Sequence, residues 1–294
     1  MVNHKFTGTG VAITTPFNEQ NEPDLKSLTN HVNYLKSNNV DFLVVLGTTG
    51  ESVTLNREEQ GKVVTTILEA NKGELPVVLG MGGNNTQALL EKINSTDFKG
   101  VDAILSVAPY YNKPTQRGLY EHFKLVAENS PVPVILYNVP GRTGKNIEPS
   151  TILKLANDFK NIVAVKEASG SIEQSMEIIR NIPPDFIVLS GEDAITLPLM
   201  SVGVSGVISV VGNVLPKETS AMVKAANNND FKKARDLHYK LLPVIEKLFA
   251  EGNPAGIKCA LELKKIIPGH LRLPLTKVSD KLKNEIQKDL NQFE

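Results

Sequence analysis

Residues 162–167 read Ile162-Val163-Ala164-Val165-Lys166-Glu167, a short apolar run that ends on two charged side chains. The apolar part is rich in β-branched residues and does not alternate with polar positions, which is typical of a parallel strand covered on both faces. A long cation such as Lys166 is least expected where burial is strongest. This segment therefore predicts a buried strand with an unusual lysine at its carboxyl end.

Seven similar apolar runs occur elsewhere in the chain, with turn residues and polar segments between them. They lie at Val11–Thr15, Phe42–Gly47, Val77–Gly80, Ala103–Val107, Val134–Tyr137, Phe186–Leu189 and Gly206–Val210. Each has the length of a strand and too few residues for a typical helix. The chain is therefore predicted to contain eight parallel strands.

Amphipathic helical patterns separate these runs. Leu25, Leu28, Val32 and Leu35 recur at spacings of three and four, which places them on one helix face. Asn56 is predicted to be the N-cap of the next helix, with Glu59 as its capping-box partner. The other helices expected before residue 203 lie at Thr115–Glu128, Glu148–Asp158, Ile172–Ile179 and Ala194–Val202.

This alternation of strand and helix predicts an α/β fold, specifically a (β/α)8 TIM barrel with a C-terminal helical extension. A closed barrel leaves no exposed strand edges, whereas the alternative, an open doubly wound sheet, keeps two. No strand pattern follows Leu215, so the barrel is expected to occupy residues 1–224 and a helical domain residues 225–294. The helices after Leu215 are expected at Pro216–Asn227, Phe231–Ala250 with a kink at Pro243, Ala255–Ile267 and Ser279–Phe293.

The composition excludes several classes of protein. Among 294 residues, 32 basic side chains balance 32 acidic ones, so no global field favours nucleic acid or an anionic membrane. The single cysteine, Cys259, cannot form an internal disulfide, and the five scattered histidines show no metal-binding spacing. With neither a signal peptide nor a spanning apolar segment in the sequence, we expect a cytoplasmic protein without a metal, nucleic-acid partner or membrane partner.

In a barrel of this kind the active site lies at the carboxyl ends of the strands, and Lys166 occupies one of them. Burial disfavours the ammonium form of a lysine and so favours the neutral, nucleophilic amine. Such an amine can form a Schiff base with a carbonyl compound, and the iminium then serves as an electron sink. The alternative is that Lys166 leaves the barrel mouth and pairs with Glu167 or with water.

Hydroxyl groups end three other predicted strands. Tyr137 ends one of them, and Thr48 and Tyr111 follow two others. A phenol alone is a poor base at neutral pH, but it can transfer protons when neighbouring hydroxyls relay them. The alternative for Tyr137 is a packed tyrosine whose hydroxyl bonds to backbone.

Two further features are suited to carboxylate groups. The turn Gly47-Thr48-Thr49-Gly50 offers backbone N–H groups and two hydroxyls. Arg142 lies in a Pro-Gly-Arg-Thr-Gly loop, where its guanidinium can hold a second carboxylate in a bidentate manner. The alternatives are an ordinary turn before a helix and a solvated loop arginine.

Seven motifs, six of them on predicted strands or their carboxyl ends, together resemble the dihydrodipicolinate synthase family of pyruvate-dependent class I aldolases. They are GTTGES at 47–52, PYYNKP at 109–114, YNVPGRT at 137–143, VKEASG at 165–170, LSGED at 189–193, GVISV at 206–210 and LRLP at 271–274. The resemblance runs from about Gly8 to Pro274 and implies the same barrel with a helical extension.

The resemblance implies a role for each of these positions. Lys166 forms the imine with pyruvate, and Thr49 with the neighbouring backbone holds the pyruvate carboxylate. Tyr137 donates and accepts protons through Thr48 and Tyr111. Arg142 binds the carboxylate of L-aspartate 4-semialdehyde, and Gly191 and Ile208 line the pyruvate site. No cofactor is implied.

The family also implies a homo-oligomer, because its relay tyrosine, here Tyr111, comes from the partner subunit of a tight dimer. The sequence leaves open a dimer or a tetramer built as a dimer of dimers. Ser52, Asn84 and Tyr110 match the pocket in which feedback-sensitive members bind L-lysine. However, Ala88 and Arg57 stand where glutamate and histidine are expected. Because the ammonium of L-lysine then lacks its ion-pair partner, the sequence predicts weak or absent inhibition.

The function implied is that of a lyase that condenses pyruvate with L-aspartate 4-semialdehyde to 4-hydroxy-tetrahydrodipicolinate, the committed step towards diaminopimelate and lysine. A second hypothesis keeps the Schiff base but changes the aldehyde, as in 2-keto-3-deoxy-sugar acid aldolases or sialic acid lyase. A third is a catalytically silent barrel that binds a keto acid as a sensor.

Overall fold

The computed structural model describes residues 4–293, and its strands form one closed barrel in the order β1 to β8. The strand pairs with a defined register are parallel. This confirms the predicted (β/α)8 architecture over the open sheet. The strands are β1 Gly8–Ala12, β2 Phe42–Val45, β3 Val77–Gly80, β4 Ala103–Val107, β5 Val134–Asn138, β6 Ile162–Glu167, β7 Ile187–Ser190 and β8 Gly206–Ser209.

Strand β1 lies nearer the N-terminus than predicted, at Gly8–Ala12 instead of Val11–Thr15. The reason is the close approach of β2. A Cβ atom on Gly10 would lie only 2.1 Å from the Phe42 ring, so the strand needs glycine at a position that propensity disfavours. Beyond the strand, the hydroxyl of Thr15 donates to the carbonyl of Gly50 at 2.7 Å and serves a turn instead of the sheet.

The backbone contacts divide the chain into two compact units. Unit 1 contains Pro76–Ile208 and the described residues before Gly8, and unit 2 contains Gly8–Leu75 and the chain from Ser209 onward. These units differ from the expected division into a barrel, residues 1–224, and a helical domain, residues 225–294. That division remains a prediction.

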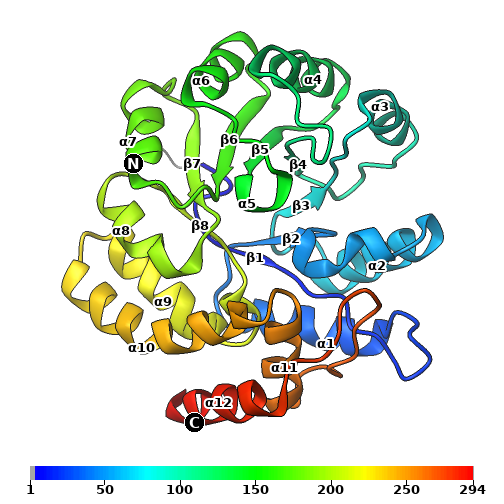
Figure 1. Ribbon diagram of the computed structural model, residues 1–294, viewed down its shortest axis with the longest axis vertical. Coiled ribbons are helices and arrows are strands. Elements are labelled where there is room, and N and C mark those ends of the chain that lie inside the picture. The colour runs from blue at the N-terminus through cyan, green and yellow to red at the C-terminus, as the bar shows by residue number, and fades with distance from the viewer. Residues whose placement is uncertain (1–3, 294) are drawn as a thin grey trace. The chain divides into compact units, whose positions relative to one another are not determined.

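In unit 1 helices and strands alternate, except that both α5 and α6 lie between β5 and β6, and neighbouring helices pack together. In sequence, α3 packs on α4, α4 on α6 and α6 on α7, and Figure 1 shows α4 and α6 side by side. Helix α3 was not predicted, although Asn85 caps it and Leu89 and Ile93 are its buried residues. The helices are α3 Thr86–Asn94, α4 Gln116–Asn129, α5 Pro140–Thr143, α6 Pro149–Asp158, α7 Ile172–Asn181 and α8 Thr196–Ser201.

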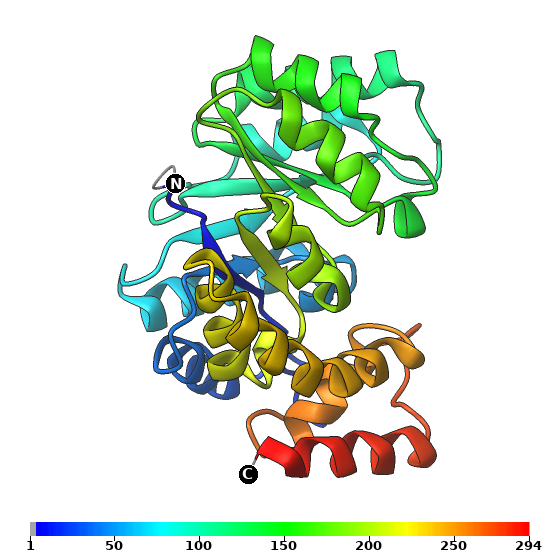
Figure 2. The ribbon, with the colours of Figure 1, turned by 90° about the vertical axis from the view of Figure 1, so that its left-hand side faces the viewer.

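Unit 2 contains the remaining helices, and the capping box predicted at the start of α2 is present. The Asn56 side chain accepts from the backbone N–H of Glu59, and the Glu59 carboxylate accepts from that of Asn56, both at 2.9 Å. Helix α10 continues through Pro243, and Figure 2 shows α12 in red beside α11 in orange. The helices are α1 Leu25–Lys36, α2 Arg57–Asn71, α9 Pro216–Asn227, α10 Phe231–Ala250, α11 Ala255–Leu263 and α12 Asp280–Leu290.

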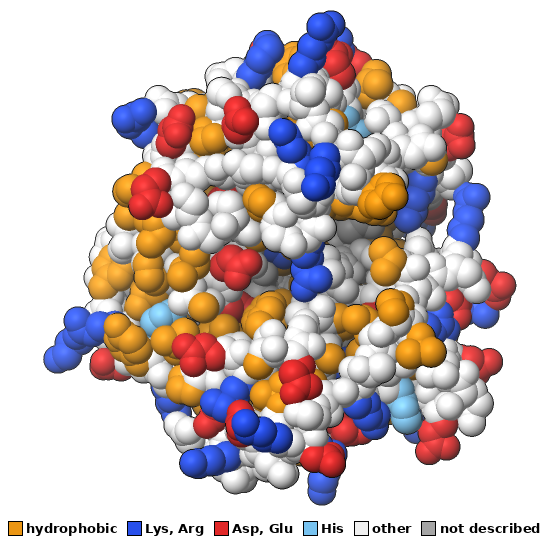
Figure 3. All heavy atoms as spheres, viewed as in Figure 1, with side chains coloured by type: hydrophobic (Ala, Val, Ile, Leu, Met, Phe, Trp, Pro, Cys, Tyr) orange, Lys and Arg blue, Asp and Glu red, His pale blue; other side chains and the backbone are white. Residues whose placement is uncertain are grey.

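The charged side chains are mixed on the surface. Figure 3 shows Lys and Arg interspersed with Asp and Glu on the face that it displays, without a large area of one sign. Between residues 4 and 293, every helix is too short or too polar to cross a membrane.

Candidate active site

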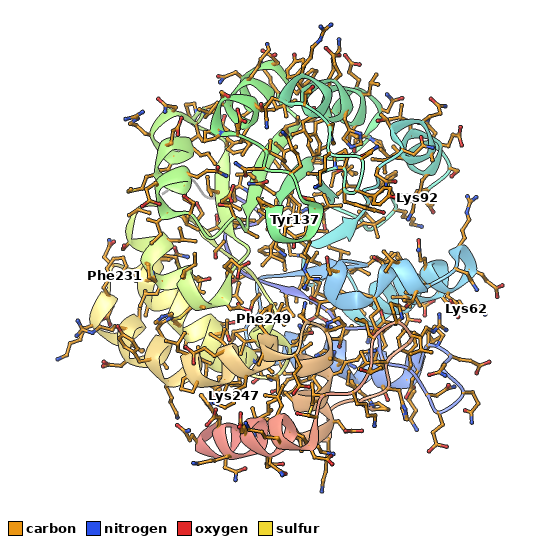
Figure 4. All side chains as sticks on the ribbon, in the orientation of Figure 1. Lys62, Lys92, Tyr137, Phe231, Lys247 and Phe249 are labelled. Atoms are coloured by element: carbon orange, nitrogen blue, oxygen red, sulfur yellow. The ribbon has the colours of Figure 1, made fainter. Side chains whose placement is uncertain are left out.

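Lys166 and Tyr137 lie side by side in unit 1, on neighbouring strands. They are register partners between β5 and β6, and Lys166 is 6% exposed and Tyr137 8% exposed. The Lys166 Nζ atom lies 4.3 Å from the centre of the Tyr137 ring. Figure 4 labels Tyr137 beside the short helix α5. A buried amine therefore lies against a phenol at the carboxyl ends of two parallel strands.

Gly191 leaves the space that the Lys166 side chain occupies. A Cβ atom on Gly191 would lie 3.0 Å from Lys166 Cε, 3.2 Å from its Cγ and 2.6 Å from the Cβ of Ala168. Gly191 follows β7, whose Leu189 is the register partner of Lys166. A larger residue at 191 would force a shift against Ala168 and would crowd the lysine side chain. Ile208 is buried in β8 with 1% exposure, as expected of a residue in a site wall.

Glu167, the residue after Lys166, does not serve as its partner. Successive strand residues point to opposite faces, and the buried Glu167 carboxylate accepts three kinds of neutral donor. These are Asn138 Nδ2 at 3.0 and 3.2 Å, the Ser169 backbone N–H at 2.7 Å and Gln174 Nε2 at 3.0 Å. The alternative of a Lys166–Glu167 pair is therefore wrong. Instead, Asn138 and Glu167 join β5 to β6 directly after Tyr137 and Lys166.

Arg142 lies in α5, directly after β5, and its side chain is exposed. Its electrostatic influence reaches Glu192, which follows Gly191. Burial raises the pKa of Glu192, and Asp193 raises it further, whereas the positive charges of Lys166 and Arg142 lower it. Lys166 and Arg142 thus both lie close enough to Glu192 for their positive charges to act on its carboxylate.

Thr48 and Thr49 belong to unit 2, where they form a tight turn after β2. Thr48–Gly50 is a single 3-10 turn, with Thr48 exposed and Thr49 buried at 3% exposure. Asn253 Nδ2 donates to Thr49 Oγ1 at 3.0 Å. Glu51, which directly follows the turn, has left-handed backbone angles. The predicted turn is present, and its second hydroxyl is held from the C-terminal part of the chain.

The remaining predicted positions are more exposed. Tyr111 follows β4 with left-handed backbone angles and an 89% exposed side chain. Tyr110 is 38% exposed, and its carbonyl accepts from Asn84 Nδ2 at 3.2 Å. Ser52 begins a second 3-10 turn in unit 2 and is half-buried. The exposed Tyr111 does not share the buried environment of Lys166 and Tyr137.

Sequence reasoning missed several buried polar residues around these positions. Asn138 and Glu167 stand next to the predicted Tyr137 and Lys166, so the motifs YNVPGRT and VKEASG already contained them. Asn253 and Lys258 gave no signal, because their contacts with residues 49 and 51 span about two hundred positions of the chain. Among residues 4–293, no group of three or more His, Cys, Asp or Glu side chains is arranged to hold a metal ion.

Comparison with known proteins shows relatives along nearly the whole chain. The model of the dihydrodipicolinate synthetase family matches residues 5–293. The 4-hydroxy-tetrahydrodipicolinate synthase of Flavobacterium psychrophilum is 50% identical over 281 residues, which is 96% of each chain.

Solved structures give the same result. Dihydrodipicolinate synthase from Thermotoga maritima is 42% identical, with a TM-score of 0.96 over 98% of this chain and 99% of that one. A structure described as the first monomeric dihydrodipicolinate synthase variant is 41% identical, with a TM-score of 0.95 over 98% and 97% of the two chains.

Proposed function

Because the chain belongs to the dihydrodipicolinate synthetase family, we propose that it condenses pyruvate with L-aspartate 4-semialdehyde to 4-hydroxy-tetrahydrodipicolinate. This is a lyase reaction of the class I aldolase type, on the route to diaminopimelate and lysine. One observation supports it most strongly: the buried Lys166 amine lies 4.3 Å from the Tyr137 ring centre. A sequestered amine beside a phenol is suited to Schiff-base chemistry.

The reaction begins when the Lys166 amine attacks the keto carbon of pyruvate, whose oxygen leaves as water. The resulting iminium withdraws electrons, so the methyl carbon loses a proton and an enamine forms. This carbon then attacks the aldehyde carbon of the second substrate, and the aldehyde oxygen gains a proton. Finally, the substrate amino group attacks the imine carbon, closes the ring and releases the Lys166 nitrogen.

Tyr137 supplies and removes the protons of these steps. A phenol beside the reacting amine needs other hydroxyls to take its proton onward, and we assign this relay to Thr48 and Tyr111. Tyr111 is 89% exposed, so its side chain is available to a second copy of the chain. The active protein is therefore a homo-oligomer, a dimer or a dimer of dimers, in which each Tyr111 completes the partner's relay.

Two carboxylates are recognised separately. The Thr49 hydroxyl and the backbone of its turn hold the pyruvate carboxylate, because backbone N–H groups in a turn favour an anion. The Arg142 guanidinium holds the carboxylate of the semialdehyde with paired hydrogen bonds. Gly191 and Ile208 form walls beside the keto acid, and the lack of a side chain at 191 leaves room next to Lys166.

Replacing Arg142 tests the identity of the second substrate. In an Arg142→Met variant, turnover of L-aspartate 4-semialdehyde should fall about a hundredfold, the loss expected for a charge-assisted contact of about 3 kcal/mol. Borohydride trapping of pyruvate should be unchanged. The matched control is Arg117→Met, because Arg117 is also exposed and lies on α4 of the same unit. Full turnover of the semialdehyde in Arg142→Met would contradict the assignment of Arg142 to the carboxylate of the second substrate.

The protein acts in the cytoplasm and is weakly inhibited or not inhibited by L-lysine. Ser52, Asn84 and Tyr110 match the family's lysine pocket, but Ala88 and Arg57 provide no carboxylate for the lysine ammonium. Half-maximal inhibition below about a millimolar, a binding free energy of about 4 kcal/mol, would contradict this proposal in an activity assay.

A further inference from the structure

Lys258 of unit 2 is completely buried, and its ammonium group makes its contacts inside the fold. Its side chain and that of Glu51 form an ion pair with 0% exposure on both sides. Its Nζ atom also donates to the carbonyl of His270 at 2.8 Å and lies 4.1 Å from the centre of the Phe17 ring. Removing two charges from water is costly unless they are paired and hydrogen-bonded. The pair therefore fixes the relative positions of α11 and the backbone at Glu51.

Glu51 stands directly after the Thr48–Gly50 turn, in a conformation that its side chain helps to hold. Its angles, φ 51° and ψ 34°, are left-handed, which is unfavourable for a residue other than glycine. The Glu51 carboxylate stabilises this conformation by pairing with Lys258 and by accepting from the Arg272 backbone N–H, which lies 3.2 Å from Glu51 Oε2. The Glu51 N–H in turn closes the turn by donating to the Thr48 carbonyl at 3.1 Å.

The same C-terminal segment also contacts the turn at Thr49. Asn253, shortly before α11, donates from Nδ2 to Thr49 Oγ1 at 3.0 Å. Because an amide nitrogen can only donate, Thr49 acts as the acceptor and keeps its own hydroxyl proton for a different group. A hydroxyl oriented in this way is prepared to donate to a carboxylate. The segment from Asn253 to Lys258 thus holds the turn both at Thr49 and at Glu51.

We propose that Lys258 and Glu51 are positioning residues, which hold the Thr48–Gly50 turn so that Thr49 and its neighbouring N–H groups can receive the carboxylate of pyruvate. This inference rests on the role proposed above for Thr49. It assigns to the C-terminal helices a part in substrate binding. Neither Lys258 nor Glu51 touches the substrate; each acts through the turn.

The test is a Glu51→Gln variant, which keeps the size of the side chain and removes its charge. The KM for pyruvate should rise about tenfold, equivalent to about 1.4 kcal/mol. The KM for the semialdehyde and the kcat at saturating pyruvate should stay within about threefold, a difference below about 0.7 kcal/mol. A general loss of folded protein would lower the apparent kcat without this split. Glu51→Asp, which restores the charge, should recover part of the pyruvate affinity.

Two controls separate the possible outcomes. Lys247→Met removes another lysine–carboxylate pair of unit 2, between Lys247 and Asp289 at 2.9 Å, and should leave the pyruvate KM unchanged (Figure 4 labels Lys247). Asn253→Ala tests the second contact without changing a charge, and it should also raise the pyruvate KM. An unchanged pyruvate KM in folded Glu51→Gln overturns the positioning role. Failure of the unmodified protein to form a borohydride-trapped pyruvate adduct contradicts the proposed function itself.

Discussion

Each unit buries a carboxylate next to a position proposed for catalysis or binding, but the two are stabilised differently. In unit 1, Glu167 is 2% exposed and accepts hydrogen bonds from neutral amide and backbone donors. In unit 2, Glu51 is 1% exposed and pairs with the Lys258 ammonium. One arrangement joins two strand ends, and the other holds Glu51, which has left-handed backbone angles, directly after a 3-10 turn.

The difference follows from what each carboxylate must hold. Glu167 lies between β5 and β6, where the sheet already fixes the backbone and neutral donors from the same unit are sufficient. Glu51 follows a turn outside the sheet, so its position depends on α11, which is distant in sequence. A buried charge pair specifies one geometry strongly, but it is destabilising when one partner is lost.

The largest loss of stability should come from breaking the buried ion pair between Lys258 and Glu51. Lys258→Met leaves the Glu51 carboxylate buried without its cation, which should lower the free energy of unfolding by about 3–5 kcal/mol. Urea unfolding measures this directly. The control Lys247→Met should cost about 1 kcal/mol or less, because its pair is partly exposed. Equal losses in the two variants would show that burial of the Lys258–Glu51 pair has no special importance.

Each unit contains a buried histidine that should make the free energy of unfolding depend on pH. Burial lowers the pKa of His31 in unit 2 and of His122 in unit 1 to about 4. As the pH falls, the unfolded chain protonates each of these histidines at a higher pH than the folded chain does. The free energy of unfolding should therefore be at its full value above about pH 6.5 and decline as the pH falls towards about 4, by up to about 3 kcal/mol for each histidine.

Urea unfolding at about pH 7 and about pH 4.5 measures this decline, which His31→Gln and His122→Gln should each reduce. The two rings differ in their partners. His31 Nε2 lies 3.1 Å from the Asn213 carbonyl, whereas His122 Nδ1 lies 2.9 Å from Thr86 Oγ1. A pH dependence that persists in both variants would assign the decline to other groups.

The smallest loss of stability should come from changing Glu167, whose carboxylate accepts hydrogen bonds from neutral donors. Glu167→Gln keeps the shape but turns one acceptor oxygen into a donor that faces other donors, so the loss in stability should be about 1–3 kcal/mol. The kcat should fall together with it, because β5 and β6 position Tyr137 and Lys166. Glu173→Gln on α7 is the control and should change neither value. If Glu167→Gln were as damaging as Lys258→Met, the distinction between the two arrangements would be lost.

The sequence predicted the strands best, because short continuous apolar runs bounded by turn residues, such as Ile162–Val165, are typical of buried parallel strands. It misplaced β1, since the strand begins at Gly8 and a glycine at position 10 weakens the pattern while admitting the Phe42 ring. Helix α11 ends at Leu263 and not at the predicted Ile267, and Lys265 takes left-handed angles just beyond.

The candidate site was predicted from residues at strand ends, and the structure brings Lys166 and Tyr137 together as expected. What the sequence could not provide is the set of contacts between distant segments. In the sequence, Lys258 resembles an ordinary lysine on a helix, and only the fold shows that its charge meets Glu51. Local pattern predicts which groups can react, whereas tertiary packing determines what holds them.

Lys166 is expected to form a Schiff base with pyruvate, and every other role proposed for the site depends on this step. The most direct measurement is the mass of the protein after treatment with pyruvate and borohydride, followed by mapping of the modified peptide. We predict the gain of one reduced pyruvyl group on Lys166, its loss in Lys166→Ala and its retention in Lys160→Ala, a control at an exposed lysine just before β6. An unmodified wild-type protein, or an adduct that persists in Lys166→Ala, would contradict the account.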